Sequence, residues 1–198
     1  MNKIDCPFFE LDHIVRLTQG IPMSRHKDKN GKFSRLVSPK HLDGLTLENS
    51  IDEVQLKNVD LAKHGLLKND IVVVLRYDIG KATLITENFS GCLADKNLAV
   101  LRCKKSSDVL PNYLVSVLNS QWFYHSQLSA ITGSSTVISI SLTQLRQLKI
   151  PVPDLITQSK LADLFFSLDK LKKSSLSALK IRQEITEESL FQLFGENI

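Results

Sequence analysis

The sequence predicts an α+β protein with a small mixed β-sheet head, residues 1–153, followed by one long C-terminal helix in residues 154–198. Two observations predict this division. Pro151 and Pro153 stand close together, and proline both lacks a backbone N–H donor and stops a helix. Residues 154–194 then contain neither proline nor glycine, whereas short β-branched runs bounded by turn residues occur earlier in the chain.

A short helix is expected at the end of the head. Ser141 is followed three residues later by Gln144, which is the spacing of a capping box, so Leu142–Leu148 should be helical with its leucines on one face. The two prolines then end this helix. The side chain of Asp154 or Thr157 can cap the long helix that follows.

The long helix carries one apolar stripe, because its leucines recur at spacings of three and four. Ser175 and Arg182 stand where a strict heptad repeat counted from Leu161 and Leu168 would place leucine. This drift favours packing on a partner helix over a long perfect zipper, and a helix folded back on its own head is the alternative. The stripe residues expected to pack are Leu161, Leu164, Leu168, Leu171, Leu179 and Ile185.

Three short apolar runs in the middle of the head predict strands. A turn at Lys68–Asp70 precedes the first run, and residues 77–80 join the first two runs into a hairpin. Arg76, Tyr77 and Lys81 therefore cluster at the end of this hairpin. The expected strands are Ile71–Leu75, Ala82–Ile85 and Leu98–Leu101.

Apolar residues on both sides of these strands are expected to complete the core of a small mixed sheet with covering helices. The opening segment should lie against the core as a short strand or helix, and a helical pattern follows Pro111. The opening residues are Phe8, Phe9, Leu11, Ile14, Val15 and Leu17. The inward helical residues are Leu114, Val117, Leu118, Trp122 and Leu128.

Positive charge is concentrated in the head. The formal net charge is +4, and from Gln158 onward six Lys and Arg balance six Asp and Glu, so the whole excess lies earlier. Between residues 16 and 40, seven cations are opposed by Asp28 alone, among turn residues such as Asn30 and Gly31. We expect a dense basic loop, which is either solvated surface or a site for an acidic partner. Its basic residues are Arg16, Arg25, His26, Lys27, Lys29, Lys32, Arg35 and Lys40.

The sequence shows little enzyme chemistry. It lacks a GxxxxGK[ST] phosphate loop, an HExxH zinc helix and a GxSxG nucleophile elbow, and no Asp or Glu stands two residues before a Lys. Nor does it contain the Gly-rich cofactor loop and Asn-Pro-Pro-aromatic motif of amino methyltransferases. The five histidines are scattered, so we expect no metal site.

Composition points to a cytoplasmic protein. The three cysteines are odd in number and lack CxxC spacing, which is typical of reduced thiols. No apolar run approaches the ~20 residues of a membrane span, and acidic residues interrupt the amino-terminal segment where a signal peptide would be apolar.

Several motifs occur in order along nearly the whole chain. The closing motif comprises Gly133, Ile140, Leu145, Ile150, Pro151, Pro153 and Gln158, leading into the long helix. Earlier motifs are Gly20–Pro22, the Lys68–Asp70 turn before IVVVLR, Cys92–Ala94 with Asn97, Pro111–Leu118 and Asn119–Ser120. This set of motifs resembles the DNA specificity subunit of type I restriction-modification systems. Asn69 stands where that family often has glycine.

The resemblance implies a non-catalytic, sequence-specific DNA-recognition protein. Members hold target recognition domains against double-stranded DNA and dock methyltransferase and restriction subunits on a pair of antiparallel spacer helices. A usual member has two recognition domains and two helices, and this sequence shows one of each. We therefore expect a head-to-tail homodimer joined by the stripe residues, and a bipartite, palindromic target. S-adenosylmethionine would bind the partner methyltransferase, and no cofactor is expected in this chain.

The same resemblance suggests roles for the basic residues. Lys27, Lys29, Lys32 and Lys81 would fix position on phosphates, whereas Arg25, Arg35, Arg76 and Tyr77 are candidates for base edges, because arginine binds guanine bidentately. His26 lies inside the same basic segment. Ser134 and Ser135, in a Gly-Ser loop, would approach the DNA backbone.

Two other functions remain open at this point. A stand-alone dimeric DNA-binding regulator with a helical dimerisation arm would explain the basic head and the helix without methyltransferase partners. It predicts stable DNA binding by the chain alone, although the sequence shows no helix-turn-helix. A nucleic-acid-modifying enzyme would need an acid, base or metal constellation, and turnover by the purified chain would reveal it.

Overall fold

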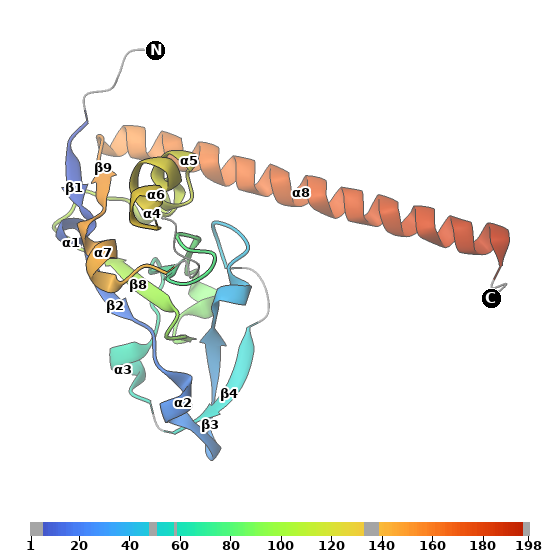
Figure 1. The fold of residues 1–198 in the computed structure, drawn as a ribbon, viewed down its shortest axis with the longest axis horizontal. Coiled ribbons are helices and arrows are strands. Elements are labelled where there is room, and N and C mark those ends of the chain that lie inside the picture. The colour runs from blue at the N-terminus through green and yellow to red at the C-terminus, as the bar shows by residue number, and fades with distance from the viewer. Residues whose placement is uncertain (1–5, 48–50, 58, 133–138, 196–198) are drawn as a thin grey trace. The chain divides into compact units, whose positions relative to one another are not determined.

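The structure is a computed structural model that describes residues 6–47, 51–57, 59–132 and 139–195. The chain divides into two compact units, residues 1–162 and residues 163–198. The elements of the fold and the long helix α8 agree with the predicted α+β class. Figure 1 shows their arrangement within the first unit, where α2 and the β3–β4 pair lie at one end and β1, β9 and α4 at the other.

Strands of the first unit are β1 (Phe8–Glu10), β2 (Val15–Gln19), β3 (Lys27–Val37), β4 (Asp52–Leu56), β5 (Ile71–Val74), β6 (Ala82–Leu84), β7 (Leu93–Ala94), β8 (Leu98–Cys103) and β9 (Lys149–Pro151). Its helices are α1 (Leu11–Ile14), α2 (Met23–His26), α3 (Leu61–His64), α4 (Pro111–Leu118), α5 (Gln121–Phe123), α6 (Ser129–Thr132) and α7 (Leu142–Gln147). Short 3-10 turns occupy Pro39–His41 and Glu87–Phe89, and a π turn occupies Tyr124–Leu128. Helix α8 spans Leu155–Phe194.

The described strands form three sheets with orders β1-β9, β2-β8-β5-β6 and β4-β3-β7. The four-stranded sheet is antiparallel throughout, and all four residues of β5 are buried. The β5–β6 hairpin and strand β8 confirm the strands predicted to begin at Ile71, Ala82 and Leu98. Asn69, in the turn before β5, has a φ of 69°, a left-handed conformation that glycine adopts without steric cost. This geometry explains why glycine suits that position and why asparagine, which tolerates it best after glycine, can replace it.

The basic segment is not a loop, which corrects the prediction. It forms α2 and then the long strand β3, which pairs antiparallel with β4. The register shifts at the turn residues: Lys27 and Lys32 both stand opposite Leu56, so residues 28–31 form a bulge. A Cβ on Gly31 would lie 2.1 Å from the Leu56 carbonyl oxygen, so glycine is needed there. Pairing with β4 thus overrides the weak strand propensity of Asp, Asn and Gly.

Two predictions about core aromatic residues were wrong. Phe8 and Phe9 are exposed, because β1 belongs to a two-stranded sheet whose other strand is β9. Trp122 is 42% exposed, because α4 ends at Leu118 and the chain begins α5 with a new cap, which buries Phe123 instead. The other apolar residues predicted inside are buried: Leu11, Ile14, Val15, Leu17, Leu114, Val117, Leu118 and Leu128.

The short helix predicted near the end of the head is present as α7. Ser141 and Gln144 form the capping box of α7, and Leu145 and Leu148 are buried. Asp154 rather than Thr157 caps α8, because its Oδ1 accepts the Thr157 backbone N–H at 3.0 Å. The Leu110–Pro111 segment is joined to the start of α8, because Gln158 Oε1 accepts the Leu110 N–H at 2.9 Å. Gln158 is fully buried.

The second unit consists of the later part of α8. Its apolar stripe is exposed: Leu164, Leu168, Leu171 and Leu179 are each 62–63% exposed and Ile185 is 60% exposed. Leu161, in the first unit, is 37% exposed. Side chains of this size rarely remain in water along a continuous line without a partner. No helix in the described part of the chain is long and apolar enough to cross a membrane.

Candidate nucleic-acid interface

The β3 bulge carries a cluster of exposed positive charge on the first unit. Lys27 and Lys32 flank the bulge and Lys29 lies within it, and all three side chains are exposed. Asp28, the acidic residue of this segment, forms no ion pair with them within the described residues, and its Oδ1 accepts the Asn30 backbone N–H at 3.0 Å. Within the described residues these lysines form no ion pair, so they remain available to an anionic partner. An exposed cationic ribbon of this kind suits phosphate contacts.

Helix α2 adds to the same end of the unit. Arg25 is exposed and unpaired within the described residues, and His26 is half-buried. The His26 carbonyl accepts the Lys57 N–H at 2.8 Å, which attaches the end of α2 to the chain after β4. Arg25, His26 and the three lysines thus lie on one continuous segment, as the sequence predicts, although on a helix and a strand instead of a loop.

Two cations of this segment already have partners. Arg35 Nη2 donates to the Asn88 carbonyl at 2.8 Å, and its guanidinium lies 6.0 Å from the centre of the Phe89 ring. Lys40 Nζ lies 2.9 Å from Asp52 Oδ1. One donor of each cation is therefore already engaged within the protein. The prediction that Arg35 reads bases stays a prediction, and these contacts make Arg35 a weaker candidate than Arg25.

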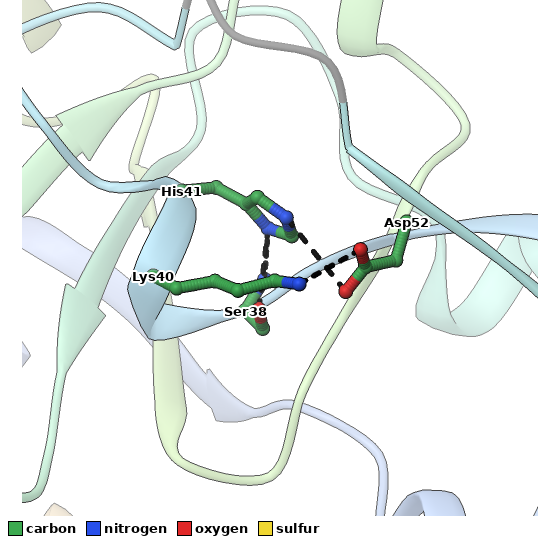
Figure 2. A network of polar contacts seen from close by, with 4 residues as sticks. All are labelled: Ser38, Lys40, His41 and Asp52. Atoms are coloured by element: carbon green, nitrogen blue, oxygen red, sulfur yellow. Dashed lines mark hydrogen bonds and ion pairs between the residues drawn. The ribbon is translucent and has the colours of Figure 1, made fainter. Parts of the chain in front are cut away.

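Lys40 belongs to a small polar network. Figure 2 shows Lys40 and His41 facing Asp52 from the same turn, with Ser38 beneath them. His41 Nδ1 accepts the Ser38 backbone N–H at 3.0 Å, so this nitrogen carries no proton, and Nε2 faces Asp52 Oδ2 at 3.8 Å. Burial lowers the pKa of His41, with Asp52 opposing this effect. The network is structural: it holds the chain between β3 and β4.

The second group of predicted residues lies on the β5–β6 turn. Arg76 and Tyr77 are exposed directly after the buried strand β5, and Tyr77 is 79% exposed with a φ of 68°. A tyrosine in the left-handed region is strained, so the fold holds this side chain outward at a cost of order 1–3 kcal/mol. Lys81 is also exposed, and its Nζ lies 2.8 Å from Asp78 Oδ2. The turn therefore presents one aromatic ring and one arginine whose side chain has no ion-pair partner among the described residues.

A polar groove of about 470 Å³ borders Arg76, and it contains residues that sequence reasoning missed. The Arg76 backbone bridges Ser139, and the Ile140 N–H donates to the Leu75 carbonyl at 2.9 Å. Amide and cationic side chains are the groups that read base edges. The polar side chains that line the groove come from Gln19, Arg76, Lys96, Asn97, Ser139, Ser141 and Gln144.

The added groove residues could not be found by charge density. Lys96 and Asn97 occupy the turn between β7 and β8, where the segment is neither rich in lysine nor regular in pattern. Gln19 joins them because its Nε2 donates to the Lys96 carbonyl at 2.8 Å. Sheet pairing of β2 with β8 brings these distant positions together. Asn97 carried a signal only through its place in the family pattern.

Other predicted sites are placed as follows. Ser134 and Ser135 lie outside the described residues. In the part of the chain that the structure describes, no group of three or more His, Cys, Asp or Glu side chains is arranged to hold a metal ion. Burial raises the pKa of Cys103 to about 11, so its thiol is a poor nucleophile at neutral pH.

Known proteins that are similar to this chain match it over nearly its whole length, which includes both the first unit and α8. A putative type I restriction enzyme MjaX specificity subunit from Methanocaldococcus jannaschii is 26% identical over 200 residues. The match covers 96% of this chain and 45% of that protein. The chain thus spans about half the length of this curated relative.

Solved structures show the same fold. The HsdS subunit from Thermoanaerobacter tengcongensis aligns with a TM-score of 0.60 and 17% identity over 98% of this chain and 43% of its own. The type I restriction-modification S subunit from M. genitalium aligns with a TM-score of 0.61 and 15% identity over 98% of this chain and 48% of its own. The family model of the type I restriction modification DNA specificity domain matches residues 7–187. The chain therefore belongs to the type I restriction modification DNA specificity domain family.

Proposed function

We propose that this chain is the sequence-specific DNA-recognition component of a type I restriction-modification complex. The observation that carries the proposal is the family match over residues 7–187, which includes the cationic first unit and most of α8. The exposed cations of α2 and the β3 bulge, together with the polar groove beside Arg76, supply a surface of the right charge and chemistry for duplex DNA.

Two copies would act together. The described residues contain one recognition unit and one long helix, and the chain spans less than half of the compared S subunits. Pairing of two α8 helices through Leu164, Leu168 and Leu171 would cover their exposed side chains. A two-fold dimer holds two identical recognition units, so its target is bipartite and palindromic.

The chain itself is proposed to be non-catalytic and cytoplasmic. Methyl transfer and base flipping would belong to a methyltransferase subunit that binds S-adenosylmethionine. The match to the family model over residues 7–187 supports this division of labour. Restriction subunits would join the same assembly.

The test is reconstitution with a methyltransferase subunit of a type I restriction-modification system from the same organism. Light scattering should give a dimer of ~45 kDa for the chain alone, twice its mass, and uptake of two methyltransferase subunits. The mixture, and neither component alone, should transfer labelled methyl groups from S-adenosylmethionine to DNA. Sequencing of the methylated sites should return a bipartite palindrome.

Two results would contradict the proposal. Stable, sequence-specific DNA binding by the chain alone with no uptake of methyltransferase would favour the stand-alone regulator. Methylation or cleavage of DNA by the purified chain without a partner would favour an enzyme. Family membership does not favour either alternative.

A further inference from the structure

A second cluster of basic residues lies on strands β2 and β8 and helix α3, outside the β3 bulge. It lines a pocket of about 250 Å³ in the first unit. The pocket is smaller than the ~300–1,000 Å³ of ordinary small-molecule sites, so it suits one compact group. We name it the β2–α3 pocket, and its polar side chains come from Arg16, Thr18, Gln19, Lys63, His64 and Arg102.

Strand pairing sets two arginines against each other at this pocket. Arg16 of β2 stands directly opposite Arg102 of β8 in the antiparallel register. Like charges at such positions destabilise a sheet, and an anion beside them relieves the repulsion. Arg102 has its anion, because its Nε donates to Asp70 Oδ1 and its Nη2 to Oδ2, both at 2.7 Å. Asp70 is thereby committed to Arg102 and leaves Arg16 without an anion.

The remaining basic side chains of the pocket also lack an anion. Arg16, Lys63 and His64 are exposed, and none of them forms an ion pair within the described residues. Among the described residues that line the pocket, none is an Asp or Glu. Asp70 offsets the charge of Arg102, so the charges of Arg16 and Lys63 remain uncompensated around one small space.

The backbone holds α3 in place at the pocket. Asp60 caps this helix, because its Oδ1 accepts the Ala62 N–H at 2.9 Å and the Lys63 N–H at 3.3 Å. Gly65, which follows α3, forms an antiparallel bridge with Leu93 of β7. Both α3 and the paired strand β2 are therefore anchored, and a site on fixed backbone loses less conformational freedom when a ligand binds.

The β2–α3 pocket adjoins both surfaces already proposed for DNA. Gln19 lines this pocket and also the polar groove beside Arg76. Gly20 and Ile21 line the pocket as well, and the chain then enters α2, which carries Arg25. The pocket thus connects the polar groove with the cationic segment of α2 and β3.

From this charge and position we propose that the β2–α3 pocket binds one phosphate group of the DNA backbone. Arg16 and Lys63 supply the opposite charge, and the Thr18 hydroxyl and the His64 ring N–H donate hydrogen bonds to the phosphate oxygens. A phosphate held there fixes the duplex against the groove beside Arg76, because phosphate contacts position a protein and base contacts specify the sequence. The inference rests on the proposed function and adds a positioning site to it.

A scan of neutral phosphates tests this contact directly. The complex with its methyltransferase is bound to cognate duplexes in which one phosphate of each half-site is replaced by an uncharged methylphosphonate. For the parent chain, replacement of the phosphate that enters the pocket should weaken binding at least about tenfold, because a charge-assisted contact is lost. For Arg16→Gln the same replacement should cost much less, because the charge that met this phosphate is already gone. The two losses are then non-additive at one linkage.

Three further variants make the scan specific. Lys63→Gln should be non-additive at the same linkage as Arg16→Gln, because both side chains border one pocket. Arg16→Lys keeps the charge and should restore the sensitivity to that linkage. Lys105→Gln is the matched control, since Lys105 is exposed and lies outside the pocket, and it should leave the pattern of the parent chain unchanged.

Full additivity of both Gln variants with every replaced linkage would overturn the inference, because neither cation would then contact a phosphate. Sequence-specific binding and methyl transfer by that complex would leave the proposed function intact. A complex that binds no duplex at all would contradict the proposed function, and the inference with it.

A free anion offers the same phosphate chemistry, and calorimetry with inorganic phosphate and with ATP separates this source from DNA. Displacement of bound inorganic phosphate by the cognate duplex would support the proposal. Saturable binding of either probe that Arg16→Gln abolishes, and that the cognate duplex leaves undisturbed, would assign the pocket to a free anion and overturn the DNA contact.

Discussion

Arg102 binds Asp70 through two parallel hydrogen bonds across the four-stranded sheet. Its Nε donates to Oδ1 and its Nη2 to Oδ2, both at 2.7 Å, and Asp70 is 1% exposed. Asp70 Oδ2 also accepts the Leu67 N–H at 2.8 Å, which joins the turn before β5 to strand β8. Asp70 thereby raises the pKa of Arg102. The turn that resembles the family's glycine-containing motif is held by this pair.

Asp70→Asn should lower the free energy of unfolding by about 2–3 kcal/mol. The amide keeps the shape of the carboxylate but accepts with one oxygen, and it leaves Arg102 without its anion. Arg102 is partly exposed, so water limits the loss. Urea unfolding measures the change.

Asp78→Asn is the matched control for Asp70→Asn. Asp78 pairs with Lys81 at the surface, where an ion pair contributes little because water and salt screen it. The control should keep the unfolding midpoint of the parent chain. Equal loss in both variants would show that burial does not set the strength of the Asp70 pair.

His41 makes stability depend on pH. Burial lowers its pKa below the usual 6.5, with Asp52 opposing the shift, so the unfolded chain takes up the proton first as the pH falls. The stabilisation is present in full above about pH 6.5 and is lost as the pH decreases towards the folded-state pKa. Protonation at Nδ1 would also break the hydrogen bond from the Ser38 N–H.

His41→Asn should flatten the fall in unfolding free energy between about pH 7.5 and pH 5.5, because asparagine accepts a hydrogen bond but does not titrate in this range. Denaturation curves at several pH values measure the slope. His125→Asn is the control, since His125 is exposed. An unchanged slope in His41→Asn would place the titrating group elsewhere.

Local patterns predicted much of the fold, and long-range pairing determined the rest. The Ser141–Gln144 capping box, the buried run at Ile71 and the cap at Asp154 each depend on neighbours within a few residues. By contrast, β3 forms because β4 pairs with it, and its composition alone indicates a loop. Trp122 was misplaced because one new cap at Ser120 rotates the helical register.

The residues of the candidate site likewise fall into those that local sequence predicted and those that only the structure revealed. A count of cations found the lysines of the β3 bulge, because charge density is local in sequence. It could not show that Arg35 already binds the Asn88 carbonyl, nor that Lys96 and Gln144 share a groove with Arg76. Those relationships depend on sheet pairing between segments far apart in the chain.

Replacement of the Gln158 side-chain amide should destabilise the fold. Its Nε2 donates to the carbonyls of Asp108 at 2.7 Å and Pro153 at 2.8 Å, and its Oε1 accepts the Leu110 N–H at 2.9 Å. Gln158→Glu removes both donors and sets a carboxylate oxygen against two carbonyl oxygens. We expect a loss of about 2–4 kcal/mol in the free energy of unfolding near neutral pH.

The loss from Gln158→Glu should shrink as the pH decreases. Burial raises the pKa of a carboxyl group, and a protonated Glu regains one O–H donor. Thermal unfolding near pH 7 and pH 5 measures the difference. Gln147→Glu, at an exposed position on α7, is the control. A loss that stays constant with pH would mean that the charge is not the cause.

DNA binding by the complex with its methyltransferase should separate two kinds of residue. Lys29→Ala and Lys32→Ala remove exposed cations of the β3 bulge, so they should weaken binding to all sequences equally. Each should also lower the slope of log affinity against log salt by about 1, because one fewer counterion is released. Lys105→Ala, exposed but outside both surfaces, should leave the slope unchanged.

Arg76→Ala should act differently from the lysine variants. Arg76 borders the polar groove and is unpaired within the described residues, so its guanidinium can reach a base edge. Its loss should cost about 1–3 kcal/mol on the cognate sequence and little on random DNA. Competition binding with cognate and random duplexes measures this ratio. A uniform loss on both duplexes would make Arg76 a phosphate contact, because only a base contact discriminates between sequences.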